Sequence, residues 1–325
     1  LGIAKRAIEL PPSTCWSSNP TIEGAGIEAD IAKLEKDFGI WRRCKALDTR
    51  QRVGRYAGLF MRIKDGKKPN EPIDGKLNGL GALVGMTPLY ESQLEVMTTD
   101  EDLQSERYGL PVTFQFNGSA EGNRNEKTNG SFEIHYSRLI IASEGSDNSD
   151  IYGVPALESC YNSLMDVRKV IGGGAEGFYK NASQSMTFSV GDPQAWIGNK
   201  DVLDKFSEQT NDFMRNRFRR ALVTPMDAKV LDSNLMSPKE FFMAALNDIS
   251  ASTGIPANLL IGSQTGVLAG DNDGKAFLAD QNSRRTDFCS TLVELVIDWL
   301  MQYGLIQKVS YEVTWSDLLE ASESD

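Results

Sequence analysis

The order of elements between residues 237 and 303 constrains the fold more than any other feature: a helix, a sharp stop, a glycine-rich segment and a second long helix. Residues 237–240 form a capping box with proline at the first helical position, which predicts the start of a helix. Gly254 and Pro256 end it, because glycine tolerates the left-handed cap and proline cannot continue the hydrogen-bond ladder. Two helices joined in this way indicate a device that presents the segment between them, residues 262–274, to another molecule.

The segment of residues 262–274 contains four glycines and no basic residue, which predicts a loop. Its centre is small, neutral or aliphatic: Ser263, Gln264, Thr265, Gly266, Val267, Leu268, Ala269 and Gly270. A second helix is predicted over residues 275–304. Its apolar stripe consists of Phe288, Leu292, Leu295, Val296, Trp299 and Tyr303.

A net charge of −11 limits the functional class. Phosphate contacts from lysine and arginine supply most non-specific affinity for nucleic acid, so a protein that grips DNA is normally basic. The charge argues against a DNA-binding enzyme, but not against a protein through which DNA slides. No apolar run approaches the ~20 residues needed to cross a bilayer, and no signal-peptide pattern follows Lys5 and Arg6, so we expect no membrane partner.

The residue inventory predicts no catalytic site, no metal site and no cofactor. His135 is the only histidine and lies in a strand pattern, which argues against histidine-based metal clusters and nucleophile triads. The four cysteines lack metal-ligand spacing and are expected to be free thiols: Cys15, Cys44, Cys160 and Cys289. Counting cannot exclude a pair of catalytic carboxylates in an acidic chain, but no spacing selects one.

A basic cluster closes the helix predicted over residues 199–222. It consists of Arg215, Arg217, Arg219 and Arg220. Three interpretations stay open for it: contact with phosphate, binding to acidic residues of a neighbouring subunit, or a solvated helix end that suits the negative pole of the helix dipole.

Hydrophobic periodicity along the rest of the chain predicts an α+β fold. Helices are expected at residues 31–52, 156–170 and 199–222, and strands at 55–63, 111–116, 131–142, 178–190 and 309–315. Residues 1–30 contain prolines at positions 11, 12 and 20 and are expected to be irregular. A dense acidic stretch separates two of the strand regions: Glu91, Glu95, Asp100, Glu101, Asp102 and Glu106.

Three motifs, in their order along residues 30–320, resemble those of phage portal proteins. The first is a strand with histidine, serine and arginine at His135, Ser137 and Arg138, followed by aliphatic residues and then by Tyr152-Gly153 before a helix. The second is the helix end of residues 249–262, with Ile-Pro, Leu-Leu and a closing glycine. The third is the final strand and loop of residues 313–318.

The resemblance implies a structural subunit, not an enzyme, that forms a ring of usually twelve copies at one capsid vertex of a virion. Double-stranded DNA passes through such a ring, without sequence specificity, during packaging and ejection. The implied partners are other copies of the chain, the major capsid protein, the terminase packaging motor and the head–tail adaptor. Assembly would take place in the host cytoplasm.

The resemblance also implies a division of the chain into the parts of a portal subunit. These are an N-terminal arm (1–30), a wing (31–198), a first stem helix (199–222), a clip (223–236), a second stem helix (237–261), a tunnel loop (262–274), a long wing helix (275–304), and a wing strand with an acidic tail (305–325). The clip would contact the motor and adaptor through Thr224, Pro225, Met226, Asp227 and Lys229. It is short for the family.

Two other classes of protein compete with this interpretation. Another ring-forming head–tail connector shares the assembly but is usually shorter and lacks the helix–loop–helix order. An acidic-cleft hydrolase that uses paired carboxylates would be a monomer or a small oligomer. The size and symmetry of the particle distinguish them.

Overall fold

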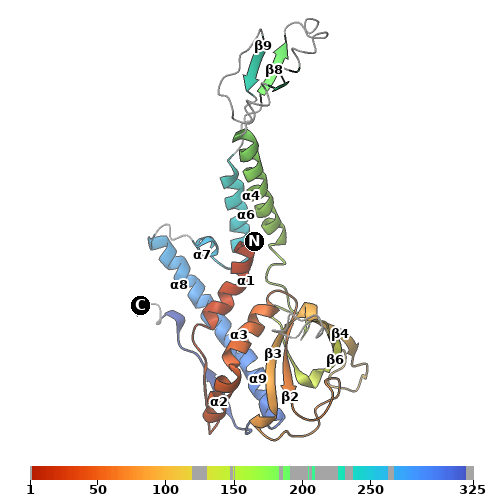
Figure 1. The fold of residues 1–325 in the computed structure, drawn as a ribbon. Coiled ribbons are helices and arrows are strands. Elements are labelled where there is room, and N and C mark those ends of the chain that lie inside the picture. Colours follow the sequence, from red (N-terminus) through yellow and green to blue (C-terminus); the bar gives the residue numbers. More distant parts are fainter. Residues whose placement is uncertain are drawn as a thin grey trace. The chain divides into compact units, whose positions relative to one another are not determined.

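The computed structural model describes residues 2–118, 130–146, 149, 151–182, 186–190, 204, 207–208, 226–230, 237–262 and 267–319. The chain divides into two compact units. Unit 1 comprises residues 1–161 and 248–325, and unit 2 comprises residues 162–247. Helices and strands contribute to both units, which confirms the predicted α+β class (Figure 1).

The strands described in unit 1 form three antiparallel sheets. The first has the order β3 (Leu83–Tyr90), β2 (Ala57–Ile63), β7 (Leu139–Ala142). The second has the order β4 (Leu94–Thr99), β5 (Pro111–Phe116), β6 (Phe132–His135). The third pairs β1 (Thr21–Gly24) with β10 (Tyr311–Thr314), so it joins the two ends of the chain. Short 3-10 turns lie at η1 (Leu80–Ala82) and η2 (Glu91–Gln93).

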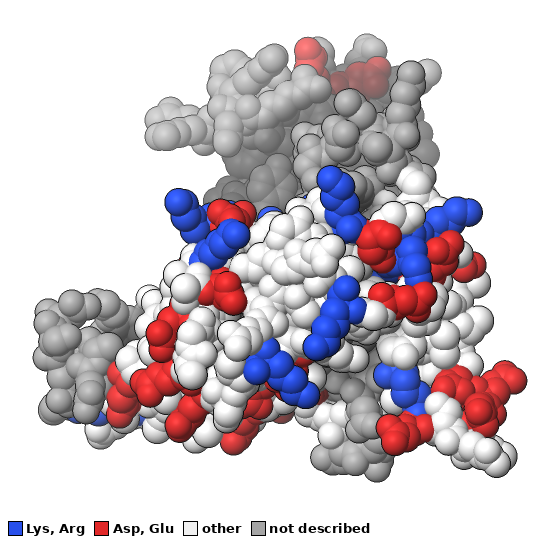
Figure 2. All heavy atoms as spheres, turned by 90° about the horizontal axis from the view of Figure 1, so that it is seen from below, with Lys and Arg blue, Asp and Glu red and all other residues white. Residues whose placement is uncertain are grey.

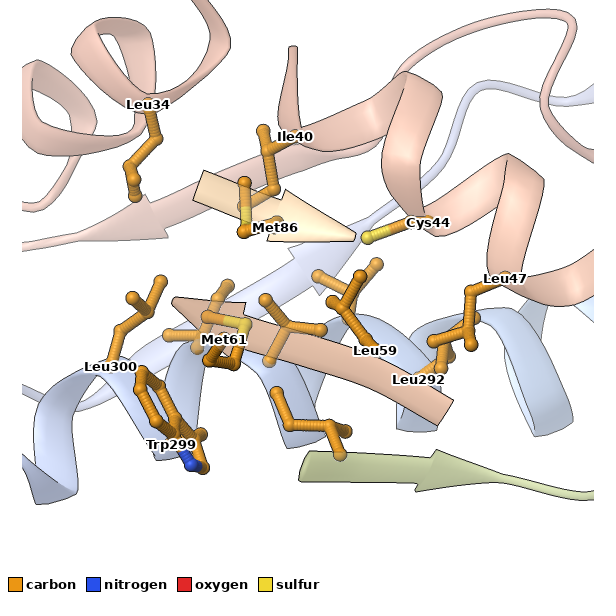
Figure 3. Close-up of a cluster of buried hydrophobic side chains, with 14 of the residues drawn as sticks. Leu34, Ile40, Cys44, Leu47, Leu59, Met61, Met86, Leu292, Trp299 and Leu300 are labelled. Atoms are coloured by element: carbon orange, nitrogen blue, oxygen red, sulfur yellow. The ribbon is translucent and has the colours of Figure 1, made fainter. Parts of the chain in front are cut away.

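The main hydrophobic core lies where α3 (Ile40–Gln51) and α9 (Ser290–Gln302) meet β2 and β3 (Figure 3). Leu59 and Met61 of β2 are fully buried, as are Leu47 of α3 and Leu300 of α9. Truncating one buried leucine of this kind costs about 2–5 kcal/mol, so the cluster is what holds the helices to the sheet. A second cluster, around Phe114 and neighbouring side chains, fills the space beside β4, β5 and β6.

The expected irregular arm of residues 1–30 is wrong, because this region forms α1 (Gly2–Cys15), β1 and the start of α2 (Glu28–Phe38). Pro11 lies inside α1 and cannot donate to the carbonyl oxygen of Ala7, four residues earlier. Arg52 Nη2 donates to that oxygen instead, at 3.4 Å. A tertiary contact therefore supplies what the proline removes.

The helix predicted over residues 31–52 is two helices, α2 and α3, separated by one residue. Gly39 has φ 62° and ψ 56°, in the left-handed region that favours glycine, and its N–H donates to the carbonyl oxygen of Glu35. This single residue redirects the chain so that both helices bury apolar faces.

The strand predicted over residues 131–142 is interrupted by a 3-10 turn, η4 (Tyr136–Arg138). The residues before the turn form β6 in one sheet, and those after it form β7 in another. The histidine–serine–arginine motif is therefore a corner at which the chain changes sheets.

Buried polar contacts fix that corner. The hydroxyl oxygen of Ser137 accepts from the N–H of Ile73 at 3.1 Å, and its carbonyl oxygen accepts from the indole N–H of Trp299 at 2.8 Å. Arg138 Nη2 lies 2.6 Å from Asp65 Oδ2, with both side chains almost fully buried. The corner is thus tied to α9 and to the loop after β2.

The last long helical stretch of the chain begins earlier than predicted. It comprises α8 (Val267–Arg284), a π-helical turn η6 (Arg285–Cys289) and α9, with Gly304 at positive φ after its end. The expected loop of residues 262–274 is therefore wrong from Val267 onward. Glycine lowers helix propensity by about 1 kcal/mol without forbidding a helix, so α8 accommodates both Gly270 and Gly274.

The described part of unit 2 contains two helices and a pair of strands. The helices are α4 (Tyr161–Ala182) and α6 (Pro238–Thr253), and β8 (Met186–Val190) pairs antiparallel with β9 (Met226–Val230). A Cβ placed on Gly174 would lie 3.6 Å from Pro238, so α4 lies beside the start of α6 (Figure 1). The sequence predicts residues 199–222 as the first stem helix and places residues 161–182 in the wing. Nearly all of residues 199–222 lie outside the described part.

The Tyr152-Gly153 motif contacts the backbone after β7. The N–H of Gly153 donates to the carbonyl oxygen of Arg55 at 2.7 Å, and the N–H of Val154 donates to that of Glu144 at 2.9 Å. A Cβ placed on Gly153 would lie 2.3 Å from the carbonyl oxygen of Glu144. Only glycine fits here without moving the backbone of Glu144.

We predict that Gly153→Ala lowers the free energy of unfolding by about 2–3 kcal/mol, because the new methyl group meets backbone atoms that cannot rotate away. Gly81→Ala is the matched control, since a Cβ there has no heavy atom within 4 Å. It should leave stability unchanged or raise it by about 0.5 kcal/mol. Urea unfolding measures both, and equal stabilities of the two variants would contradict the prediction.

Candidate functional site

The predicted helix stop exists and leads directly into the segment expected to carry function. α6 ends at Thr253, Gly254 has φ 67°, and the hydroxyl of Ser250 donates to the carbonyl oxygen of Ile255 at 2.7 Å. A one-turn helix, α7 (Ala257–Ile261), follows, and it ends at a left-handed glycine, Gly262. The chain therefore turns twice within about ten residues before α8 begins.

The structure covers the predicted functional residues unevenly. Ser263, Gln264, Thr265 and Gly266 lie outside the described residues, whereas Val267, Leu268, Ala269 and Gly270 begin α8. Arg215, Arg217, Arg219, Arg220, Thr224 and Pro225 also lie outside them, whereas Met226, Asp227 and Lys229 belong to β9.

An ionic network holds the other end of α8. Arg284, in its last turn, contacts Asp48 of α3 through Nη2–Oδ1 at 2.5 Å and Nη1–Oδ2 at 3.0 Å. The same guanidinium contacts Glu144 through Nε–Oε1 at 2.7 Å and Nη2–Oε2 at 2.8 Å. One arginine thus bridges two carboxylates that are 96 residues apart in sequence.

Neutral and charged groups complete the network. The indole N–H of Trp16 donates to Asp48 Oδ2 at 2.9 Å, and Gln51 Nε2 donates to Glu144 Oε2 at 2.9 Å. Arg52 Nη1 lies 3.5 Å from the same Glu144 oxygen. The side chain of Asp48 is fully buried, so the bridging arginine and these donors replace the water that the carboxylate loses.

The pKa values of the network follow from this geometry. Burial disfavours the charge of Arg284, but the attraction of Asp48 and the hydrogen bonds to both carboxylates outweigh it and raise its pKa. Burial would likewise raise the pKa of Glu144, but the hydrogen bond from Arg284 and its positive charge lower it overall. Both groups are therefore charged at neutral pH.

The π-helical turn places a second arginine in the interior. Arg285 is 1% exposed and donates from Nε to the carbonyl oxygen of Cys15 and from Nη1 to that of Ser316, each at 2.7 Å. Because a π turn adds a residue to the helical repeat, Arg284 and Arg285 both reach buried partners, on different elements. Arg285 thereby ties both ends of the chain to the helix that carries Arg284.

Neither histidine nor cysteine takes part in a metal-binding cluster in the described residues. The Nδ1 atom of His135 lies 2.9 Å from the hydroxyl of Ser137, and burial lowers its pKa. All four cysteines are buried and unpaired, and the described residues contain no group of three or more candidate metal ligands. Among the same residues, no helix has the length and hydropathy of a membrane span.

Charged side chains are interspersed on the face shown in Figure 2. Blue lysine and arginine side chains alternate with red aspartate and glutamate side chains, and they do not merge there into one basic surface. A mixed surface of this kind gives DNA little to hold, in keeping with the net charge of the chain.

Comparison with known proteins identifies the family. The model of the phage portal protein family matches residues 1–325, the entire chain. The chain belongs to this family. A search of curated proteins gave no match.

Solved structures from gene transfer agent (GTA) particles share the portal fold. The neck of an empty GTA particle, computed with C6 symmetry, aligns with a TM-score of 0.62 and 14% identity over 99% of this chain and 84% of that one. The neck of a native GTA particle, computed with C12 symmetry, aligns with a TM-score of 0.59 and 13% identity over 100% of this chain and 84% of that one. The virion of a native GTA particle aligns with a TM-score of 0.58 and 13% identity, again over 100% of this chain and 84% of that one.

Membership of the portal family makes the chain a structural protein and not an enzyme. The alternative of an acidic-cleft hydrolase, for which the sequence offered many carboxylates but no pair selected by spacing, is therefore wrong.

Sequence reasoning missed the network of Arg284, Asp48 and Glu144. One local signal pointed to it: Arg284 lies four residues before Phe288, on the apolar stripe of the helix, where an arginine is expected to be buried and paired. Its partners could not be found, because they lie 236 and 140 residues away.

We predict that Arg284→Met lowers the free energy of unfolding of the portal subunit by about 3–5 kcal/mol, because it leaves two carboxylates without their bridging cation. The exposed pair of Arg55 and Glu91, in which the arginine side chain is 57% exposed, is the matched control. Arg55→Met should cost at most about 1 kcal/mol. Denaturant unfolding of both variants tests this, and similar losses would contradict it.

The lowered pKa of Glu144 predicts a pH dependence. The stabilisation is fully present above the unperturbed value of 4.5 and is lost as the pH falls below 4.5 through the folded-state pKa. Glu144→Gln removes this contribution, so the difference in unfolding free energy between wild type and variant should shrink as the pH falls. Urea unfolding from neutral to acid pH measures it, with the exposed Glu133→Gln as control. A constant difference would refute the prediction.

Proposed function

We propose that the chain is the repeating subunit of a ring, usually of twelve copies, at one capsid vertex, through which double-stranded DNA enters and leaves a virion. The observation that carries this proposal is the family match along all 325 residues. The C6 and C12 symmetries of the related GTA necks support a ring of identical copies. The same ring would dock the terminase motor, the head–tail adaptor and the major capsid protein, and would assemble in the host cytoplasm.

The parts of a portal subunit can be assigned to the elements of the fold. We propose unit 1 as the wing, α4 and α6 as the stem, and β8 with β9 as the clip that meets the motor and adaptor. The clip contacts would then include Met226, Asp227 and Lys229, with Thr224 and Pro225 beside them. The segment from Gly262 to the start of α8 would line the channel.

Exposed aromatic side chains on unit 2 support a stem that packs against other copies. Phe178 and Tyr179 of α4 are each 75% exposed, and Phe241 of α6 is 56% exposed. A closed ring requires head-to-tail interfaces, and exposed apolar surface is what such interfaces bury. The cluster of Arg215, Arg217, Arg219 and Arg220 would serve the same interface or contact phosphate.

The proposed channel segment suits passage without binding. Each phosphate held by lysine or arginine adds affinity that a motor must overcome. Residues 263–270 contain no charged residue, so a duplex could slide past them. The acidic surplus of the chain would repel the DNA backbone elsewhere.

We predict that the purified chain forms rings of about 430 kDa, the mass of twelve 35.8-kDa copies. Deleting residues 266–270 should leave ring assembly intact and reduce the amount of packaged or retained DNA, because it shortens the channel segment. Deleting five residues between β5 and β6, 120–124, is the control. Negative-stain imaging and DNA-protection assays provide the measurements. A monomeric chain would refute the ring, and normal packaging by the deletion variant would refute the channel assignment.

A further inference from the structure

A pocket of about 290 Å³ lies in unit 1 beside β2, β3 and the ends of β5 and β6. Three arginines line it: Arg43 and Arg50 from α3 and Arg62 from β2. Three phenylalanines form its apolar wall: Phe60, Phe116 and Phe132. The ring of Phe132 lies 4.9 Å from that of Phe116 and 6.1 Å from that of Phe60.

The charge of this pocket is opposite to that of the chain as a whole. The sequence has 45 acidic and 34 basic residues, yet none of the residues that line the pocket is acidic. Aromatic side chains bind apolar groups, and guanidinium groups bind carboxylates in a directional way. The pocket therefore suits an apolar side chain that has carboxylates beside it.

The loop between β4 and β5 carries such a set of side chains. Leu103 is 78% exposed, more than any other large hydrophobic side chain described. The carboxylates of Glu101, Asp102 and Glu106 around it are also exposed. The one basic residue nearby, Arg107, lies over the ring of Tyr136 at 3.7 Å from its centroid.

Hydrogen bonds within this loop hold it in one conformation. Asp100 Oδ1 accepts from the N–H of Asp102 at 3.0 Å, and its Oδ2 accepts from the hydroxyl of Ser105 at 2.6 Å. Asp102 Oδ1 accepts from the N–H of Gln104 at 3.0 Å. A preorganised loop loses less conformational entropy on binding, so an exposed leucine on it is an efficient anchor.

The loop and the pocket lie at opposite ends of the same sheet. Leu94 pairs with Phe116 at the pocket end, and Thr99 pairs with Pro111 at the loop end. Six strand residues span about 20 Å, so the loop cannot enter the pocket of its own copy. Only a second copy can bring the two together, through a head-to-tail contact that repeats around a ring.

We propose that the loop of residues 100–106 of one copy inserts Leu103 into the arginine–phenylalanine pocket of the neighbouring copy, with Glu101 and its acidic neighbours facing the arginines. This inference rests on the proposed ring and names one contact that closes it. The contact is heterologous, because each copy offers the loop on one end of the sheet and the pocket on the other.

The first test is the variant Leu103→Asp. The side chain is exposed, so the fold of a single copy should not change, whereas the anchor is lost. The concentration at half-assembly, measured by sedimentation velocity, should rise about tenfold or more. Met97→Asp on β4, 51% exposed and outside the loop, is the matched control and should assemble like wild type.

Charge exchange tests the acidic side of the contact. Arg62 is an exposed pocket residue, so its reversal should spare the fold. Arg62→Glu and Glu101→Arg should each weaken assembly, and the two together should restore a large part of it. A double variant no better than the weaker single variant would overturn the pairing.

A cysteine pair tests proximity directly. In a chain with Leu103→Cys and Thr87→Cys, oxidised glutathione should join the two thiols into a disulfide between copies and leave reduced glutathione. The native cysteines are buried, so the engineered thiols are the ones within reach. Denaturing electrophoresis without reductant should then show a ladder of linked chains, whereas each single variant should not.

The outcomes separate this inference from the ring itself. A wild-type chain that stays monomeric overturns both. Wild-type rings, combined with unchanged assembly of Leu103→Asp and no cross-linked ladder, overturn the loop–pocket contact alone.

Discussion

The bridge from Arg284 to Asp48 and Glu144 fixes how the long C-terminal helix sits on the rest of unit 1. A buried ion pair is not by itself a source of stability, because desolvation of the charges offsets much of their attraction. What the bridge provides is geometry. A planar guanidinium that binds two carboxylates at once restricts both the rotation of α8 about its own axis and its displacement along α3. We infer that the network specifies the position of this helix more than it strengthens the fold.

The π turn extends this constraint to both ends of the chain. Arg285 binds the carbonyl oxygens of Cys15 and Ser316. Cys15 lies shortly before β1 and Ser316 shortly after β10, and these two strands pair with each other. An ordinary helix would carry two successive arginines on directions about 100° apart in a regular repeat, whereas the π turn changes that repeat locally. The cost of the irregular turn is offset by the hydrogen bonds that every nitrogen of both buried guanidinium groups donates. Four segments, at Cys15, Asp48, Glu144 and Ser316, are thereby held by two adjacent residues.

Local signals were sufficient for some elements and failed for others. The helix start at Pro238 and the stop at Gly254 were predicted correctly, because each depends on neighbouring residues alone. The N-terminal helix was missed because Pro11 normally breaks a helix, and the rescue by Arg52 is a tertiary contact. The break after His135 was missed for a similar reason, since Ile73 and Trp299 fix it from far along the chain. The network around Arg284 had one local sign, a basic residue on an apolar stripe, and no sign of its partners.

The length of α8 separates two mechanical roles in the proposed ring. Its 18 residues span about 27 Å, so the segment that would face DNA lies about that far from the anchoring network. A displacement at residues 263–266 would therefore bend or tilt a helix whose far end is held by two carboxylates and a hydrophobic core. In the proposed ring, the neutral residues before and at the start of α8 would keep contacts with a duplex weak, while the charged residues at its end keep the helix in place. Separating weak contacts from strong ones along one helix would allow DNA to move without loosening the subunit.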